Sequence, residues 1–279
     1  MSTSNARVTV RFLSHTPGVA SRGRVRSTPS PGSRSFHSSS LPEIALTFDD
    51  GPNPVFTPQI LHVLEHYGVK ATFFCIGEQV QRYPDLLQQI QQAGDTIGVH
   101  GWDHTDLTKH SSDEIDQQLR STSMAIQQAT GTSPAFFRPP YGSTDKEVVD
   151  IASTLGLTQV LWTINTEDWQ RPGVEAIVHA ALTNVQNGSI LLMHDGGDDR
   201  SETVEALPQV ITGLQQRGFT FVTVEQLPEE QLPRLSDAGS RLKAEKGRRG
   251  MLTTHFLFFP RDAMRGIFVG SVAKSGKEI

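Results

Sequence analysis

The amino-acid sequence predicts an α/β fold in which parallel strands form an open sheet or an incomplete barrel. Short runs of β-branched and aromatic residues alternate with longer segments of helical period. Each intervening segment is long enough for the crossover that joins two parallel strands. The chain has 279 residues, 36% of them hydrophobic, and one cysteine. Its core must therefore be held by packing rather than by disulfides.

The expected elements follow from this alternation. Seven strands are expected, at residues 44–48, 70–77, 96–100, 135–138, 159–164, 189–194 and 219–224. Six helices are expected, at residues 57–67, 78–94, 112–130, 144–156, 173–185 and 203–218. Ser112 and Thr144 begin segments that suit helix N-caps. Glycines stand where four of the helices should stop, namely Gly68, Gly94, Gly156 and Gly218.

Charge divides the chain into three regions. Residues 1–42 are rich in serine and hold six arginines and no acidic side chain, which predicts a disordered basic tail. Residues 234–279 hold ten basic and four acidic side chains and are expected to form a basic C-terminal tail, in which the apolar stretch 251–259 is either a weak strand or part of the tail. Residues 43–233 form the expected folded domain, with a net charge of −17. That charge argues against nucleic acid as a partner and suits a neutral or cationic ligand.

The sequence contains no run of 18 or more apolar residues, so we expect no membrane span. The N-terminal region lacks the apolar segment of a secretory signal. Its arginine- and serine-rich composition resembles an organelle transit peptide, but Pro17, Pro29 and Pro31 interrupt the amphipathic helix that such a peptide needs. We therefore interpret residues 1–42 as an unstructured tail.

Polar side chains follow five of the expected strands at the point where each strand ends. The carboxyl ends of parallel strands open on one face of an α/β fold, and active sites assemble there. We therefore expect five loops to bring titratable side chains to one rim. These residues are Asp49 and Asp50, His100 and His104, Arg138 and Tyr141, Asp168 and Trp169, and His194 and Asp195.

A metal site explains this set of side chains economically. His100 and His104 are four residues apart, so on a helical turn both imidazoles would lie on one side and reach one ion at about 2.0–2.1 Å. A carboxylate would complete the three-residue set of a catalytic zinc site, with one position left for water. Asp49 and Asp50 diverge at the end of a strand, so one can bind the metal while the other acts as a base. The metal would acidify the water, and the base would remove its proton as it attacks a carbonyl.

Several other residues have simpler interpretations. The H-x-x-x-H spacing alone is a weak signal, and its repetition at His62 and His66 falls inside an expected helix, so we assign that pair to a surface or packing role. Asp198 and Asp199 lie in a glycine-rich acidic turn and are expected to be solvated. Cys75 lies in an apolar strand and is expected to be a buried thiol. The sequence contains no G-x-S-x-G motif and no phosphate-binding glycine loop, which argues against serine hydrolase and nucleotide chemistry.

The motifs together resemble those of the polysaccharide deacetylases of carbohydrate esterase family 4, the chitin and peptidoglycan deacetylase superfamily. The resemblance covers residues 43–227 and includes five motifs in order. These are TFDDGP at 47–52, HGWDH at 100–104, RPPYG at 138–142, TEDW at 166–169 and LMH at 192–194. The resemblance implies a distorted, incomplete (β/α) barrel of parallel strands, formed by residues 43–233, that uses a divalent metal, usually zinc, to remove acetyl groups from sugars.

The resemblance also implies roles for the residues of the first three motifs. Asp49 looks like the general base. Asp50, His100 and His104 look like the metal ligands. Arg138 would pair with Asp49 and hold it ionised. Asp50, His100 and His104 would thus share one ion, with the general base Asp49 beside it.

The other implied roles concern the departing group and the acetyl slot. His194 would be the general acid that protonates the leaving amine, and Asp168 would orient it and stabilise its charge. The backbone N–H of Tyr141 would supply an oxyanion donor. Trp169 and Leu192 would line the slot for the acetyl methyl group. Amide hydrolysis needs a protonated leaving group as well as a nucleophile, so Asp49 and His194 would act from opposite sides of the metal.

Two positions depart from the family pattern. Gly101 follows the first metal histidine, where the family usually has serine or threonine, so a hydroxyl that can brace the histidine loop is missing. Asn165 stands where the fourth motif often opens with aspartate. Neither departure removes a group to which the resemblance assigns chemistry.

The implied substrate is a glycan that contains N-acetylglucosamine, such as chitin, chitooligosaccharides or peptidoglycan, with acetate as product. Two alternatives remain open. One keeps the chemistry and changes the substrate to an acetylated xylan ester, a cyclic imide or a ureide, and the other is a catalytically silent glycan-binding module. Family members usually work at the cell envelope or outside the cell, which is the expected location. Nothing in the sequence indicates an oligomeric state.

Overall fold

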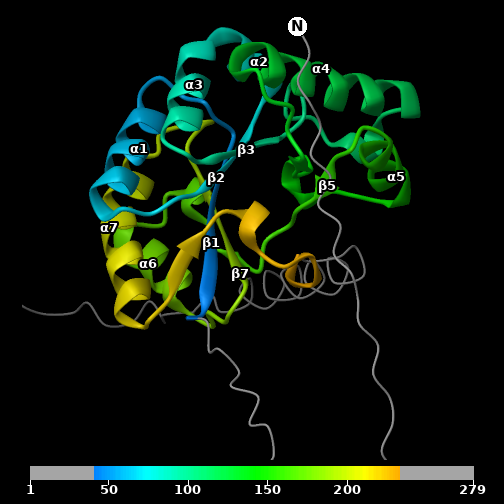
Figure 1. The fold of residues 1–279 in the computed structure, drawn as a ribbon. Coiled ribbons are helices and arrows are strands. Elements are labelled where there is room, and N and C mark those ends of the chain that lie inside the picture. The colour runs from blue at the N-terminus through cyan, green and yellow to red at the C-terminus, as the bar shows by residue number, and fades with distance from the viewer. Residues whose placement is uncertain (1–40, 233–279) are drawn as a thin grey trace, which may run out of the picture. The chain divides into compact units, whose positions relative to one another are not determined.

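The computed structural model describes residues 41–232 of the chain. Within this range, seven α-helices surround one curled sheet of eight parallel strands (Figure 1). The predicted class, an α/β fold with an incomplete barrel of parallel strands, is confirmed. The predicted C-terminal tail with its stretch 251–259 lies outside the described residues, as do all but the last two residues of the predicted tail 1–42.

The elements alternate along the chain as expected. The strands are β1 (Glu43–Asp49), β2 (Thr72–Cys75), β3 (Thr96–Val99), β4 (Phe136–Phe137), β5 (Thr158–Gln159), β6 (Ile164–Asn165), β7 (Ser189–His194) and β8 (Thr220–Val222). The α-helices are α1 (Phe56–Tyr67), α2 (Gly77–Arg82), α3 (Pro84–Gln92), α4 (Ser112–Thr130), α5 (Lys146–Thr154), α6 (Val174–Leu182) and α7 (Ser201–Gln216). Two 3₁₀ helices, η2 (Pro140–Gly142) and η3 (Asp168–Gln170), lie at the rim. No helix within residues 41–232 has the length and apolar character needed to cross a bilayer.

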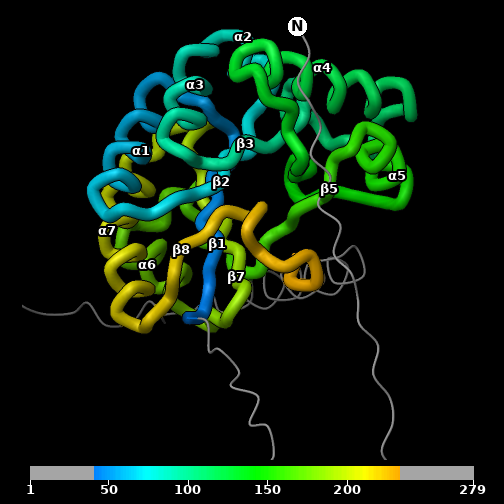
Figure 2. Tube along the Cα trace, viewed as in Figure 1, coloured from blue at the N-terminus to red at the C-terminus, as the bar shows by residue number. Residues whose placement is uncertain are grey.

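The sheet runs in the order β5-β4-β3-β2-β1-β7-β6, and every pairing is parallel. Strand β8 pairs with the first residues of β1, whereas β2 pairs with its last residues. Figure 2 shows β8 beside β1. The two ends of the order, β5 and β6, are not paired with each other, so the barrel is open between them.

Side chains along β1 and β7 alternate between two apolar layers. This alternation directs Asp49 and His194, at the strand ends, toward the barrel interior. Ile44, Leu46 and Phe48 belong to the layer between the sheet and the helices, whereas Ala45 belongs to a second layer with Phe74. Side chains in a strand alternate between its two faces, so Thr47 and Asp49 share the face of Ala45. By the same rule, Leu192 and His194 share the face of Ile190, another member of the second layer.

The expected strand 159–164 is wrong, because the chain breaks into β5 and β6 around residues 160–163. The cause is a distant side chain. Arg138 Nε donates to the Val160 carbonyl at 3.1 Å, and Nη2 donates to the Leu161 carbonyl at 3.4 Å. A buried guanidinium therefore takes carbonyls that a continuous strand would offer to a neighbour.

The expected helix 78–94 is also two helices, α2 and α3, which meet at Tyr83. Pro84 occupies the first turn of α3, where its missing N–H costs nothing, but it cannot continue α2. The N-caps differ from the expectation by one residue each. Ser111 forms a capping box with Glu114 at α4, and the Asp145 side chain caps α5 by accepting from the backbone N–H of Val148.

Candidate active site and metal centre

Strand register brings the ends of β1 and β7 together. Asp49 is the register partner of His194 on β7 and of Phe74 on β2. His100 follows β3, and its backbone N–H donates to the Cys75 carbonyl at the end of β2. The carboxyl ends of the central strands thus meet at one rim, as the sequence pattern predicts.

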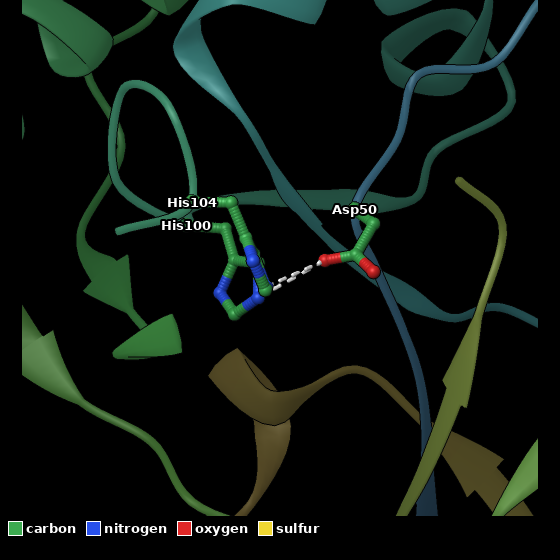
Figure 3. A group of neighbouring side chains, drawn as sticks. All are labelled: Asp50, His100 and His104. Atoms are coloured by element: carbon green, nitrogen blue, oxygen red, sulfur yellow. Dashed lines mark ion pairs between the residues drawn. The ribbon is translucent and has the colours of Figure 1, made fainter. Parts of the chain in front are cut away.

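Asp50, His100 and His104 converge at this rim. One ligand atom from each lies within 4.8 Å of the others. Oδ1 of Asp50 lies 3.3 Å from Nε2 of His100 and 3.1 Å from Nε2 of His104. Figure 3 shows both imidazole rings directed toward the Asp50 carboxylate. The structure therefore has a candidate Asp/His/His metal site.

Two observations show that these residues fit a divalent cation. His100 Nδ1 donates to the Arg138 carbonyl at 2.8 Å, which leaves the Nε2 lone pair facing the cluster, the arrangement typical of metal-binding histidines. Asp50 Oδ1 is buried and accepts no hydrogen bond of good geometry within the described residues. Burial opposes ionisation of Asp50, but the close approach of His100 and His104 holds its pKa well below the usual range. The carboxylate is therefore ready to bind a cation.

The predicted helical turn between the two histidines is wrong. Residues 100–104 form a loop, in which Gly101 has φ 76° and His104 has φ 63°. The first of these values favours glycine, so Gly101 suits the loop although it lacks the family's hydroxyl. Instead, the Gly101 carbonyl accepts from the Thr122 hydroxyl at 2.9 Å and from the Gly77 N–H at 3.0 Å. A backbone anchor thus holds the histidine loop.

Asp49 is paired with a buried arginine inside the barrel. Arg138 Nη1 donates to Asp49 Oδ1 at 2.7 Å and to the Thr47 hydroxyl at 2.8 Å. The guanidinium carbon lies 4.2 Å from the centre of the Phe74 ring, an arrangement typical of cation–π contacts. The second oxygen, Asp49 Oδ2, lies 3.6 Å from Nε2 of His100. One side of the carboxylate is therefore held by Arg138, and the other faces the metal cluster.

Asp168 and His194 form a second pair, in which the carboxylate is buried and the imidazole is 12% exposed. Nδ1 of His194 donates to Asp168 Oδ1 at 2.7 Å, and the His194 backbone N–H donates to Oδ2 at 2.9 Å. Burial alone would lower the pKa of His194, but Asp168 raises it above the usual value. Burial opposes ionisation of Asp168 as well, and the hydrogen bonds from His194 lower its pKa nonetheless. The imidazolium form of His194 is thereby favoured, with Nε2 left to hold a proton.

Of the three expected substrate-binding residues, Tyr141 contacts a candidate metal ligand. The Tyr141 ring packs edge-on against His104, with 4.6 Å between ring centres, and is 64% exposed. Trp169 is 44% exposed. Leu192 is buried in β7, two residues before His194, the last residue of the strand.

The residues with simpler interpretations lie where expected. His62 and His66 are exposed on α1, and Asp198 is exposed. Asp199 is partly exposed and forms an ion pair with Arg171 at 2.9 Å. Cys75 is fully buried, and burial raises the pKa of its thiol.

Sequence reasoning brought Asp195 to the rim without a role. Its carboxyl group is fully buried and accepts a short hydrogen bond from the Thr57 hydroxyl. Burial raises the pKa of Asp195 to about 7. A Cβ atom on Gly51 would lie 2.2 Å from Asp195 Oδ2, so this carboxyl group packs directly under the turn that carries Asp50. The sequence feature that could have indicated this contact is Gly51, which follows Asp49 and Asp50.

Threonine hydroxyls form the second group that sequence reasoning missed. Thr47, Thr166 and Thr203 each contact a side chain of the two buried pairs. Thr47 and Thr166 stand inside the motifs, but Thr203 lies on α7, and no spacing relates it to the rim. Only the packing of α7 against the sheet reveals it.

This fold and this site define a class of hydrolases with an incomplete (β/α) barrel, in which a candidate metal site and an Asp–His pair lie at the strand ends. The family model for polysaccharide deacetylase matches residues 38–160. A peptidoglycan-N-acetylglucosamine deacetylase from Bacillus cereus is 40% identical over 186 residues, which cover 66% of this chain and 87% of that protein. A chitooligosaccharide deacetylase from Sinorhizobium fredii is 38% identical over 196 residues, which cover 66% and 91%. The chain belongs to the polysaccharide deacetylase family, the family 4 carbohydrate esterases.

Solved structures of the same family include both active and inactive members. A family 4 carbohydrate esterase from Streptomyces lividans, in complex with acetate, is 32% identical with a TM-score of 0.62, covering 65% of this chain and 93% of that one. A family 4 pseudoenzyme from Bacillus anthracis is 33% identical with a TM-score of 0.63, covering 67% and 65%. Because a pseudoenzyme shares this fold, the fold alone does not establish a reaction. The reaction of this chain is therefore inferred from the side chains at the rim.

Proposed function

We propose that residues 43–233 form the catalytic domain of a metal-dependent deacetylase that hydrolyses the acetamide groups of N-acetylglucosamine units in glycans. The observation that carries this proposal is the register pairing of Asp49 with His194 beside the Asp50, His100 and His104 cluster. A base and an acid on neighbouring strands suit a reaction that needs both. The names of the relatives support chitooligosaccharides and peptidoglycan as the substrate class.

Asp50, His100 and His104 would hold the metal ion. Two imidazole nitrogens and one carboxylate oxygen are a common ligand set for catalytic zinc, and this favours zinc over its first-row neighbours. When bound there, a divalent cation acidifies water and polarises a carbonyl oxygen.

Asp49 would act as the general base. Its carboxylate takes a proton from the attacking water while the water oxygen forms a bond to the acetyl carbonyl carbon. Arg138 keeps this carboxylate fixed and charged, because its guanidinium donates to Oδ1 from the barrel interior. The remaining oxygen, Oδ2, is the one that faces the cluster.

His194 would act as the general acid. Its imidazolium gives a proton from Nε2 to the amide nitrogen as the carbon–nitrogen bond breaks, so that acetate and a free amine leave. Asp168 holds the Nδ1 proton and stabilises the charged ring. The product amine is cationic at neutral pH and is compatible with the net charge of −17 of residues 43–233.

The remaining site residues would bind the acetyl group. The Tyr141 backbone N–H donates to the oxyanion that develops on the carbonyl oxygen. Trp169 and Leu192 form the apolar lining for the acetyl methyl group. Because the relatives include an enzyme named for peptidoglycan, we propose that the reaction takes place at the cell envelope or outside the cell.

A catalytically silent glycan-binding module is the second candidate, and the similarity to a pseudoenzyme favours it. Against it, every residue to which we assign a proton transfer or a metal bond is present. Asp49, Asp50, His100, His104 and His194 all stand at the rim.

Acetate release tests the proposal. The full chain, loaded with zinc, is incubated with chitooligosaccharides, peptidoglycan fragments and acetylated xylan, and acetate is measured. We expect release from an amide substrate, and loss of release in Asp49→Asn and in His104→Ala. His66→Ala is the matched control, since His62 and His66 have the same spacing on an exposed helix face.

The outcomes separate the alternatives. Release from xylan alone would make the chain an ester hydrolase. Glycan binding without metal and without acetate release would favour the silent module. Full turnover in Asp49→Asn or His104→Ala would overturn the mechanism.

A further inference from the structure

The Asp168 carboxylate accepts four hydrogen bonds, two on each oxygen. Oδ1 accepts from Nδ1 of His194 at 2.7 Å and from the Thr166 hydroxyl at 3.2 Å. Oδ2 accepts from the His194 backbone N–H at 2.9 Å and from the Thr203 hydroxyl at 2.8 Å. Three different segments therefore fix this carboxylate: its own loop, the end of β7 and the first turn of α7.

The two threonines contribute unequally. A hydroxyl has one proton, and Thr166 directs it mainly to the Leu192 carbonyl, at 2.8 Å. Thr203 has Asp168 Oδ2 as its one acceptor within the described residues. Its side chain is fully buried, so water cannot replace it. Among residues 41–232, Thr203 thus makes the only undivided side-chain hydrogen bond that Asp168 receives from outside the Asp–His pair.

The direction of the carboxylate matters because the last torsion of an aspartate side chain is soft. Rotation of the Asp168 carboxylate would turn the His194 ring with it, because Nδ1 follows Oδ1. The Nε2 proton would then no longer point along the path to a leaving nitrogen. A donor on Oδ2 resists this rotation from the side opposite to the ring.

We propose that Thr203 is a positioning residue for the general acid: its hydroxyl locks the Asp168 carboxylate and thereby aims His194 at the leaving group. The inference deepens the proposed function and rests on it. Within the described residues, the Thr203 hydroxyl bonds Asp168 and none of the candidate metal ligands, so it acts on one half of the reaction. Protonation of the leaving group should suffer when it is lost, whereas attack by water and metal binding should not.

The test compares Thr203→Val, which keeps the shape and removes the hydroxyl, with Thr203→Ser, which keeps the hydroxyl. Thr212→Val is the matched control, because Thr212 lies on the same helix and its hydroxyl donates only to the backbone of α7. Two substrates are used, a chitooligosaccharide acetamide and 4-nitrophenyl acetate. The nitrophenolate departs without a proton, so the ester does not depend on the acid.

We expect Thr203→Val to lower kcat on the acetamide about tenfold, with KM and zinc content unchanged, and to lower hydrolysis of the ester less than about twofold. Thr203→Ser should restore the acetamide rate. A merely structural role would lower both rates together. Equal loss on both substrates, or wild-type rates in Thr203→Val, would overturn the proposal.

A second measurement does not depend on turnover. The His194 Nδ1 proton, shared with a buried carboxylate, should give a downfield proton NMR signal that exchanges slowly with solvent in the wild type and in Thr203→Ser. We expect faster exchange in Thr203→Val. If wild-type protein releases no acetate, the proposed function fails, and this signal alone then decides whether Thr203 positions the pair. An unchanged signal in Thr203→Val counts against the inference in either case.

Discussion

Arg138 reaches Asp49 from inside the barrel, with 2.7 Å between Nη1 and Oδ1, and both side chains are almost completely buried. The same guanidinium donates to the carbonyls of Val160 and Leu161 in the segment that joins β5 to β6. The Arg138 side chain therefore holds both the candidate base and the segment between β5 and β6. Its replacement should lower both the stability of the fold and the rate of acetate release.

Arg138→Met should destabilise the protein by about 3–5 kcal/mol, because it leaves the Asp49 carboxylate buried without its counter-charge. Urea unfolding measures this change, and acetate release measures the accompanying loss of activity. Lys146→Met is the control, since the Lys146–Asp150 pair is exposed and should contribute nothing measurable. Equal stability of the two variants would contradict the role assigned to Arg138.

Removal of the metal should lower the melting temperature, and returning zinc should restore it. An ion that binds only the folded state adds about 2.7 kcal/mol of stability when its free concentration is a hundredfold above Kd. Thermal unfolding with and without a chelator measures the shift, and metal analysis gives the stoichiometry. His100→Ala should show no zinc-dependent shift, whereas His66→Ala should respond as the wild type does.

The alkaline limb of the pH–rate profile should report His194. The general acid must be protonated, so kcat falls as pH rises through its pKa. Asp168 raises that pKa above the usual value despite burial, so the fall should occur at a higher pH than for a free histidine, about 6.5. Asp168→Asn removes the negative charge and should move the limb to lower pH. An alkaline limb that stays in place would assign the titration to another group.

Gly51→Ala should destabilise the protein by about 1–3 kcal/mol and lower zinc affinity. The new Cβ would lie 2.2 Å from Asp195 Oδ2, so the turn that carries Asp50 would have to shift. Unfolding in urea and zinc titration measure the two effects. Asp195→Ala creates space, and in that background Gly51→Ala should cost less. An additive double mutant would mean that the contact with Asp195 is not the cause.

Local patterns predicted the long elements well. The expected helix 112–130 matches α4 to the residue, because its apolar period is long, although the capping residue is Ser111 rather than Ser112. The strand ends that carry Asp49, His100 and His194 were also predictable, since alternation and parallel topology suffice to bring them to one rim.

The expected helix 78–94 breaks at Pro84, which is a local signal. The other errors arose where a distant side chain or an unusual backbone angle decides the outcome. The strand 159–164 breaks because Arg138 takes its carbonyls, and no property of those six residues reveals it. The loop 100–104 is not helical because Gly101 and His104 adopt positive φ. Thr203 gained its candidate role only from the packing of α7, which lies outside every motif.

The open side of the barrel has a consequence for the working molecule. Arg138 holds both Asp49 and the segment that joins β5 to β6, so a motion that draws this segment away from Arg138 should also loosen the hold on the base. Readiness for turnover and order in this segment should therefore fluctuate together. The rate of hydrogen exchange at the amides around Val160 would measure the fraction of molecules in which Arg138 holds Asp49 in place.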